Sequence, residues 1–249
     1  MRRLSLVVAA FACAAALAAA PVPKEPTVDE VVAKYVAARG GLTKIRSLKT
    51  LRQKGHVTAG PDKHGVVTRE IKRPASTRFE FKVQGVTSVF VSDGTRGWRV
   101  DPAQGDTAPT LLSDAVIAEA AEQGDFEGPL VDWKAKGHRV ELAGREDVLG
   151  KPAFKLKVTL KSGAVRYEYI DVASSALVRS EATRLMRGHQ TQVQTTFSNF
   201  KKTGGLLFPG VVEVEVAGRP DKLHIDVQSV EVNPALSDAR FAMPASLTK

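Results

Sequence analysis

The sequence contains one cysteine, Cys13, and it lies in the first apolar segment of the chain. Leu4 to Ala20 is rich in alanine and apolar except for Ser5, and it follows two arginines at positions 2 and 3. This order of charged, apolar and small residues is typical of a secretory signal peptide, so we expect residues 1–20 to be a cleavable signal. The mature protein then has no cysteine and depends on its core for stability, without disulfides.

Two alternatives for this segment are weaker. A membrane anchor needs about 20 strongly apolar residues, and this run is shorter and only mildly hydrophobic. Lipid attachment at Cys13 is disfavoured because the residues before it (Ala10-Phe11-Ala12) lack the usual leucine and the apolar run continues beyond it. Cleavage after Ala18 satisfies the small-residue rule, whereas cleavage after Ala20 leaves Pro21 at the new N-terminus. We expect a periplasmic protein, exported and without a lipid anchor.

The sequence also lacks the residue patterns of an active site. Its five histidines are scattered and none has a partner at metal-ligand spacing: His56, His64, His138, His189 and His224. No G-x-S-x-G nucleophile elbow and no phosphate-binding loop occur. A hydrolase needs a nucleophile, a base and an orienting group that converge, and the chain offers no such set. We therefore expect no enzyme activity, no catalytic residue, no metal and no cofactor.

Aromatic residues make up only 6% of the chain, and those in strands fall mainly on the apolar faces. Nucleic-acid binding is therefore poorly supported, because stacking platforms need aromatic side chains among basic ones. The formal charge of +9 becomes +7 when Arg2 and Arg3 are removed with the signal. This charge is compatible with an anionic membrane surface as a partner, but alternation of Lys155 and Lys157 with apolar residues favours ordinary solvated strand faces.

What the sequence does contain is repeated amphipathic strands joined by tight turns. Phe79, Phe81 and Val83 alternate with polar residues, which is the period of a strand with one apolar face. Turns are marked by Lys161-Ser162-Gly163 and Thr203-Gly204-Gly205. We expect strands near residues 51–58, 66–73, 77–84, 86–92, 96–101, 138–143, 153–161, 164–171, 176–186, 190–201, 206–216 and 222–232.

Helices are few. After an extended linker over residues 21–26, Thr27 and Glu30 form a capping box, and the apolar stripe that follows ends at Gly40 and Gly41. A short helix is expected near 43–47. A third, over 113–123, carries Val116, Ile117 and Ala120 on one face and ends at Gly124. Glu119 and Glu122 lie on the opposite face, which we interpret as solvated.

The helices are too small to cover the apolar face of the strands. About 11 strands at ~4.8 Å spacing give very roughly 1,200 Å² per face, whereas about 30 helical residues shade roughly 450 Å². The sheet must fold into two layers, close on itself, or curl into a trough that the helices partly plug, and the last two leave an apolar cavity. The residues expected to line it are Phe79, Phe81, Trp98, Phe154, Leu156, Tyr167, Tyr169, Leu223 and Ile225.

One expected strand, Thr191 to Thr196, is polar on nearly both faces. It is either an edge strand or part of a cavity mouth.

Several segments, in this order, resemble the bacterial outer-membrane lipoprotein-sorting proteins with the LolA/LolB-like fold. They are Val32 to Gly41 (VAKYVAARGG), Ile45 to Leu51 (IRSLKTL), Ala121 to Asp132 (AEQGDFEGPLVD), Tyr167 to Asp171 (YEYID), Phe197 to Lys201 (FSNFK) and Gly205 to Pro209 (GLLFP). The chain is similar to divergent members of this family, and the segments are spread over most of the sequence after the signal, from Val32 to Pro209.

The resemblance implies a mainly β (α+β) fold: a curved, incomplete antiparallel β-barrel of about 11 strands, with two or three helices plugging its concave face and one domain over residues 27–249. It also implies a periplasmic carrier that shelters the acyl chains of a lipoprotein or another lipid, loaded and unloaded by a membrane-bound donor or acceptor. The lid helices would contribute Val32, Tyr35, Val36, Val116, Ile117 and Ala120. The alternative on the same scaffold is a periplasmic sensing or interaction module that binds a lipid or peptide signal.

Overall fold

The computed structural model describes residues 25–186 and 189–248. The expected signal peptide and residues 21–24 of the expected linker lie outside the described residues. None of the helices in the described ranges is both long and apolar enough to cross a membrane.

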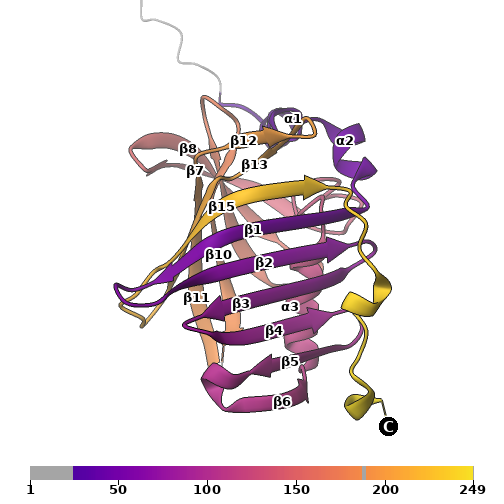
Figure 1. Ribbon diagram of the computed structural model, residues 1–249. Coiled ribbons are helices and arrows are strands. Elements are labelled where there is room, and N and C mark those ends of the chain that lie inside the picture. Colours follow the sequence, from indigo (N-terminus) through magenta and orange to yellow (C-terminus); the bar gives the residue numbers. More distant parts are fainter. Residues whose placement is uncertain (1–24, 187–188, 249) are drawn as a thin grey trace, which may run out of the picture.

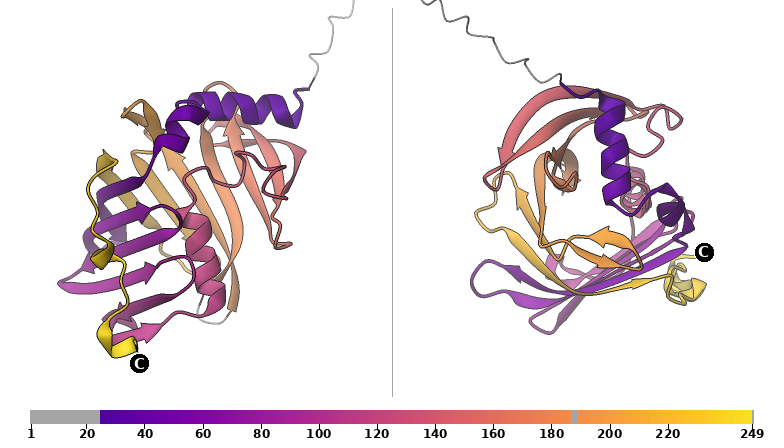
Figure 2. Two further views of the ribbon diagram at one scale, coloured as in Figure 1. Left: turned by 90° about the vertical axis from the view of Figure 1, so that its right-hand side faces the viewer. Right: turned by 90° about the horizontal axis from the view of Figure 1, so that it is seen from above.

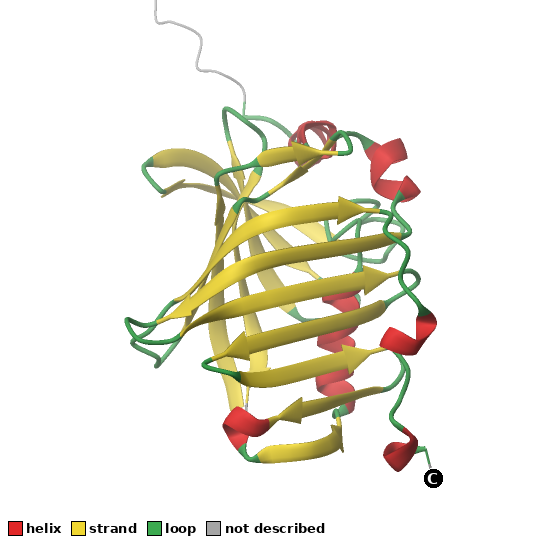
Figure 3. Ribbon diagram, in the orientation of Figure 1, coloured by secondary structure: helices red, strands yellow, loops and turns green. Residues whose placement is uncertain are grey.

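The described chain contains three α-helices, α1 (Val28–Ala38), α2 (Leu42–Ser47) and α3 (Asp114–Gly124), and three short 3₁₀ helices, η1 (Pro102–Gln104), η2 (Asp238–Arg240) and η3 (Ala245–Leu247). Strands make up most of the rest (Figures 1 and 3). They are β1 (Thr50–Ala59), β2 (His64–Lys72), β3 (Ser76–Val83), β4 (Val86–Ser92), β5 (Gly97–Asp101), β6 (Asp106–Leu111), β7 (Arg139–Val148), β8 (Lys151–Thr159), β9 (Val165–Asp171), β10 (Leu177–Met186), β11 (His189–Ser198), β12 (Lys201–Thr203), β13 (Leu206–Phe208), β14 (Val211–Val216) and β15 (Leu223–Val232).

Thirteen of these strands form one antiparallel sheet, in the order β6-β5-β4-β3-β2-β1-β15-β14-β11-β10-β9-β8-β7, and β12 pairs only with β13. The N-terminal strands and the C-terminal strands form two arms, and β15 joins them by pairing with both β1 and β14. Because β6 and β7 lie at opposite ends of this order, the sheet is not closed. Seen from above, it curls around the helices (Figure 2). The expected curved, incomplete antiparallel barrel is confirmed.

The expected helices are also confirmed. α1 begins with the capping box, in which the Thr27 side chain accepts from the backbone N–H of Glu30 while the Glu30 carboxylate accepts from the backbone N–H of Thr27. It ends before Gly40, whose φ is 116° and whose added Cβ would lie 2.4 Å from the carbonyl oxygen of Gly205. Only glycine fits this close approach to the β12–β13 hairpin. Ser113 is the N-cap residue of α3.

Two apolar clusters hold α1 and α2 at one end of the curved sheet. Val31, Val32 and Tyr35 of α1 pack against buried side chains of β7, β8 and β9. Ile45 of α2 and Leu48 pack with Leu51, Ile71, Phe126 and Leu206. The two helices therefore cover one end of the concave face and leave the rest to α3, which lies between the two arms (Figure 2).

The strand boundaries differ from expectation in three places. β6 was not expected, because Pro109 and the polar residues around it lack an alternating pattern. The expected strand at 206–216 is two strands, β13 and β14, since Pro209 and Gly210 interrupt it. The polar strand β11 pairs with β10 and β14 on its two sides, so it is not an edge strand.

The C-terminal residues 233–248 form a segment that packs on the convex face of the N-terminal arm. Leu236 and Phe241 bury Val91. Arg240 forms an ion pair of 2.6 Å with Glu70, whose side chain is fully buried, and the Trp98 indole donates to the carbonyl oxygen of Ala242.

Candidate functional site: the concave face of the sheet

The pairing register divides the strand residues between the two faces, because residues directly opposite each other on neighbouring strands point to the same side. Phe79 lies opposite Arg69 and Phe90, and Arg69 hydrogen-bonds to α3. In the other arm, Leu156 lies opposite Glu168, and Leu156 packs against α1. These positions define the concave face, on which all three α-helices lie.

Six of the nine residues expected to line a cavity belong to this face. They are Phe79, Phe81, Phe154, Leu156, Leu223 and Ile225. Phe154 and Leu156 are already covered by α1, whereas the other four are half-buried. The register places Phe79 and Phe81 of β3 on the same face as Leu223 and Ile225 of β15, with β2 and β1 between the two pairs.

Trp98, Tyr167 and Tyr169 do not line the concave face, which corrects the expectation from sequence. Trp98 lies opposite Val91 and packs with it under the C-terminal segment. Tyr169 lies opposite Lys155, whose ammonium is 5.4 Å from the ring centroid, and its hydroxyl donates to Glu181. Burial raises the pKa of Tyr169 to about 12. These aromatic side chains cover the convex face instead.

The helix residues expected to form a lid fall into two groups. Val32 and Tyr35 are buried, and Val36 packs beside them in the core at the end of the sheet that α1 and α2 cover. In α3, Ile117 is buried, while Val116 and Ala120 are half-buried.

Seven apolar side chains of the concave face are only half-buried, and we call them the open apolar surface. Val193, Val212, Val214, Val216, Leu223 and Ile225 lie on the neighbouring strands β11, β14 and β15, and Phe81 lies on β3, beyond the buried Val57 of β1 and Val67 of β2. Cross-strand pairing places Val193 opposite Val216 and Val214 opposite Leu223. The four valines were not among the cavity residues expected from the sequence, although the alternation of Val212, Val214 and Val216 indicates one apolar face of β14.

Charged side chains occupy the space between α3 and the C-terminal arm. Arg184 approaches Glu119 at 3.3 Å, and Arg166 approaches Glu122 at 3.7 Å and Glu168 at 2.6 Å. Both carboxylates pair with arginines of the sheet, and Glu119 is half-buried, which corrects its interpretation as solvated; Glu122 stays exposed beside Arg166. Burial raises the pKa of Glu119, although Arg184 opposes this. Burial also raises the pKa of Glu168, whose side chain is 1% exposed, against the effect of Arg166.

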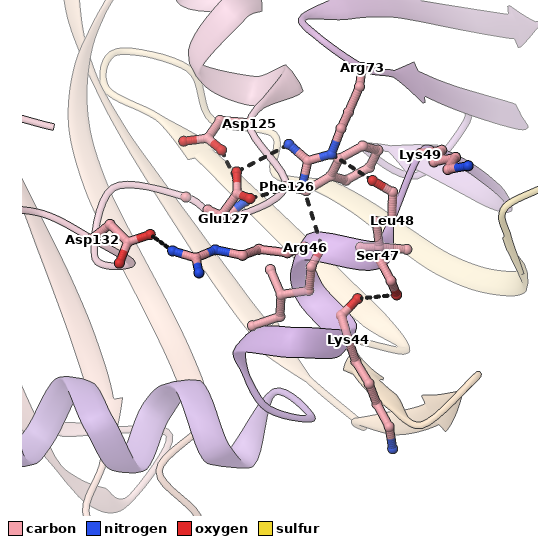
Figure 4. A network of polar contacts seen from close by, with 12 residues as sticks. Lys44, Arg46, Ser47, Leu48, Lys49, Arg73, Asp125, Phe126, Glu127 and Asp132 are labelled. Atoms are coloured by element: carbon pink, nitrogen blue, oxygen red, sulfur yellow. Dashed lines mark hydrogen bonds and ion pairs between the residues drawn. The ribbon is translucent and has the colours of Figure 1, made fainter. Parts of the chain in front are cut away.

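A second polar network fixes the loop after α3 (Figure 4). Arg73, at the end of β2, donates to the carbonyl oxygen of Leu48 at 2.6 Å and pairs with Glu127 at 2.9 Å. Its guanidinium also lies 5.2 Å from the ring centroid of Phe126. Partial burial alone would raise the pKa of Glu127, but hydrogen bonds from Arg73 and its neighbours hold it at about 2. This network seats α2 and the loop against the N-terminal arm.

Two pockets border these elements. One of about 220 Å³ lies beside the end of α3, between Glu122, Asp125, His138 and Arg166. The other, of about 510 Å³, is formed by the loop 217–222 with Glu181, Gln194 and Glu215. These three side chains share the face of Tyr167, the convex side, and the residues around the pocket also include Val193 and Val216 of the concave face. Its polar side chains do not suit an acyl chain.

Within residues 25–186 and 189–248, no three histidine, cysteine or carboxylate side chains lie together as metal ligands would. The chemistry available on the concave face is apolar contact from the open apolar surface and charge from the arginines beside it.

No protein-family model matches the chain, and no curated protein matches its sequence. Solved structures match its fold. A DUF1329 family protein from Desulfovibrio piger has a TM-score of 0.55 at 14% identity, covering 86% of this chain and 97% of that one. A LolA superfamily protein from Nitrosomonas europaea also has a TM-score of 0.55, at 13% identity, covering 88% and 99%.

An outer membrane lipoprotein-sorting protein domain from Vibrio parahaemolyticus has a TM-score of 0.53 at 12% identity, covering 86% of this chain and 97% of that one. At this identity the likeness concerns the fold, and it extends over nearly the whole length of all three structures. The chain has a divergent form of the LolA-like fold, the fold of the outer-membrane lipoprotein-sorting proteins that its sequence resembles.

Proposed function

We propose that this protein is a periplasmic carrier that binds the acyl chain of a lipid or lipoprotein on the open apolar surface. The observation that carries the proposal is the exposure of this surface. Its residues lie on the concave side of a curved sheet, where core side chains are normally buried, yet they stay half-buried: α1 and α2 cover one end of this side, and α3 packs on β3, β4 and β10. Large apolar areas left open on a concave face are typical of ligand-binding sites.

The energetics favour an acyl chain as the occupant. Burying one CH₂ group contributes about 0.8 kcal/mol, so a chain of roughly 14 methylenes gains on the order of 11 kcal/mol before the costs of association. Binding of this kind needs no reaction and no cofactor, and neither is part of the proposal.

The N-terminal sequence and the fold support an exported location. Residues 1–20 have the pattern of a signal peptide, and one of the structures with this fold is described as an outer membrane lipoprotein-sorting domain. We place the protein in the periplasm, with residues 27–249 as one domain, and outer-membrane lipoprotein sorting as the process it serves. A membrane-bound donor and acceptor would then load and unload it.

The proposal is tested with a matched pair of substitutions in one strand. Val214 lies on the concave face of β14, opposite Leu223, and Val211 lies on the convex face, opposite Asp226. Val214→Asn is expected to weaken binding of a diacylated lipopeptide at least about 10-fold, because an unpaired amide is placed against the acyl chain. Val211→Asn makes the same change in the same strand and should leave binding within about 2-fold.

Binding is measured by titration calorimetry, and organic extracts of the natively purified proteins are analysed by mass spectrometry. The wild-type protein and Val211→Asn should release acyl lipids, and Val214→Asn should release few. Equal lipid content and equal affinity in both variants would show that the open apolar surface does not bind the acyl chain.

A further inference from the structure

Arg69 is a cation on the concave face that pairs with no carboxylate in the described part of the chain. Its guanidinium donates to two neutral oxygens, the side-chain carbonyl of Gln53 at 3.1 Å and the backbone carbonyl of Gln123 at 2.7 Å. Its Nε is buried and has no hydrogen-bond partner among the described residues. A guanidinium has five N–H donors, so most of its hydrogen-bonding capacity is unused here.

The other arginines of the concave face are neutralised. Arg166 pairs with Glu168, Arg184 with Glu119, and Arg99 with Asp106 at 2.7 Å. Each carboxylate partner lies on the same face or on α3, so the charges of these arginines are balanced by the protein. Arg69 is the exception, and its positive charge has no counterpart among the described ion pairs.

The surroundings of Arg69 make this unpaired charge costly. Its guanidinium lies 5.7 Å from the ring centroid of Phe79, and burial lowers its pKa to about 10. The Arg69 side chain is half-buried, and a partly desolvated charge without a counter-ion is unfavourable. Phe81, a member of the open apolar surface, lies on the same face of β3, two residues beyond Phe79.

We propose that Arg69 binds the carboxylate of a long-chain fatty acid whose hydrocarbon tail lies on the open apolar surface. This inference rests on the proposed function and, of the lipid or lipoprotein named there, takes a lipid as the ligand: a single-chain amphiphile with one negative charge. One unpaired guanidinium balances one such charge, and its planar N–H groups match the two oxygens of a carboxylate. Phe79 and Phe81 lie on β3 beside the cation, and the apolar side chains of Val67 on β2 and Val57 on β1 continue this face toward β15.

Arg69 also tethers the end of α3 through Gln123, and a cation near a helix C-terminus is favourable by itself. That role uses one donor and explains neither the unpaired Nε nor the absence of a carboxylate. The two roles are separated by asking whether Arg69 discriminates between a charged and a neutral ligand with the same tail.

The experiment compares palmitate with hexadecanol at pH 8 on delipidated wild-type protein and on Arg69→Gln, Arg69→Lys and Arg99→Gln. Wild-type protein is expected to bind palmitate at least about 10-fold more tightly than hexadecanol. Arg69→Gln should lose this preference while still binding hexadecanol. Arg69→Lys should keep part of the preference because it keeps the charge. Arg99→Gln, the control on the same face, should keep the preference in full.

The outcomes separate the two proposals. If neither the wild-type protein nor any of the variants binds palmitate or hexadecanol, the proposed acyl-binding function itself is refuted. If wild-type protein binds both ligands equally, or if Arg69→Gln keeps the preference for palmitate, the role of Arg69 is refuted while acyl binding stands. A preference for lysophosphatidylglycerol over lysophosphatidylcholine without one for palmitate would replace the carboxylate by a phosphodiester and also overturn the assignment.

Discussion

Individual residues show where sequence periodicity is informative and where it is not. Alternation in Tyr167 to Asp171 correctly predicts a strand with two different faces. Because aromatic side chains usually lie in the core, the tyrosines were expected on the concave face. The structure places Glu168 inside and the tyrosines outside, because Glu168 has Arg166 as a partner on the concave face. The identity of the concave face depends on which distant segments pack against it, and periodicity within one strand does not contain that information.

A prediction at this scale concerns Arg166. Arg166→Met leaves the Glu168 carboxylate, 1% exposed, without its ion-pair partner. Breaking a buried pair on one side costs about 3–5 kcal/mol, so the free energy of unfolding in urea should fall by about that amount. Arg139→Met, which removes an exposed pair with Glu141, is the control and should change it by less than about 0.5 kcal/mol. Similar small changes in both variants would mean that Glu168 does not depend on Arg166.

At the scale of elements, the sequence predicts helices well and short or irregular strands poorly. α1 has a capping box, an apolar stripe and a glycine stop, and all three are local signals. The C-terminal segment 233–248 has no periodic pattern, and its position depends on contacts with strands more than 100 residues earlier, such as Arg240 with Glu70. The valines of β14 were within reach of pattern analysis, whereas the unpaired state of Arg69 required the tertiary structure.

A second prediction concerns this C-terminal segment. Glu70 is fully buried and is held by Arg52 at 2.8 Å and Arg240 at 2.6 Å. Arg240→Met should lower the free energy of unfolding by about 1–3 kcal/mol, since Glu70 loses one of two partners. It should also speed amide exchange in residues 234–248 and shift Trp98 fluorescence to the red. Lys222→Met, which removes an exposed pair, is the control; unchanged exchange in Arg240→Met would argue against this anchoring role.

At the scale of the whole molecule, the mainly β architecture follows from the repeated strand pattern. The shortage of helices leaves three shapes open, a two-layered sheet, a closed one or a trough, and only the family resemblance predicts the open curvature. The strand order does not follow from the pattern, because nothing in the sequence of β15 specifies that it pairs with both β1 and β14. The same holds for the balance of charges in the folded state. The pKa of Glu127 is lowered whereas the pKa values of Glu119 and Glu168 are raised, and these directions depend on partners that only the fold brings together.

These pKa shifts lead to a third prediction, which concerns how the free energy of unfolding depends on pH. The pKa of Glu127 is about 2, below its usual value, so its stabilising contribution is complete above about pH 5 and is lost as the pH falls toward 2. The pKa values of Glu168 and Glu119 are raised, so their ionised forms destabilise the folded state. This destabilisation decreases as the pH falls and the two carboxylates become protonated. Glu127→Gln should lower the free energy of unfolding by about 1–3 kcal/mol at pH 7 and by much less at pH 2.5.

The measurement is urea unfolding of both proteins at the two pH values, with Glu141→Gln, a change in an exposed pair, as the control. An equal loss at both pH values would show that the ionised form of Glu127 does not stabilise the fold.

The position of β15 has a consequence for the order of assembly. The strand made last during synthesis occupies the middle of the sheet and is hydrogen-bonded to the strand made first. A growing chain can form the hairpins of either arm, but it cannot link the arms until its C-terminal residues are released. A topology completed only by its final strand therefore delays the joining of the two arms until β15 is available to pair with both β1 and β14.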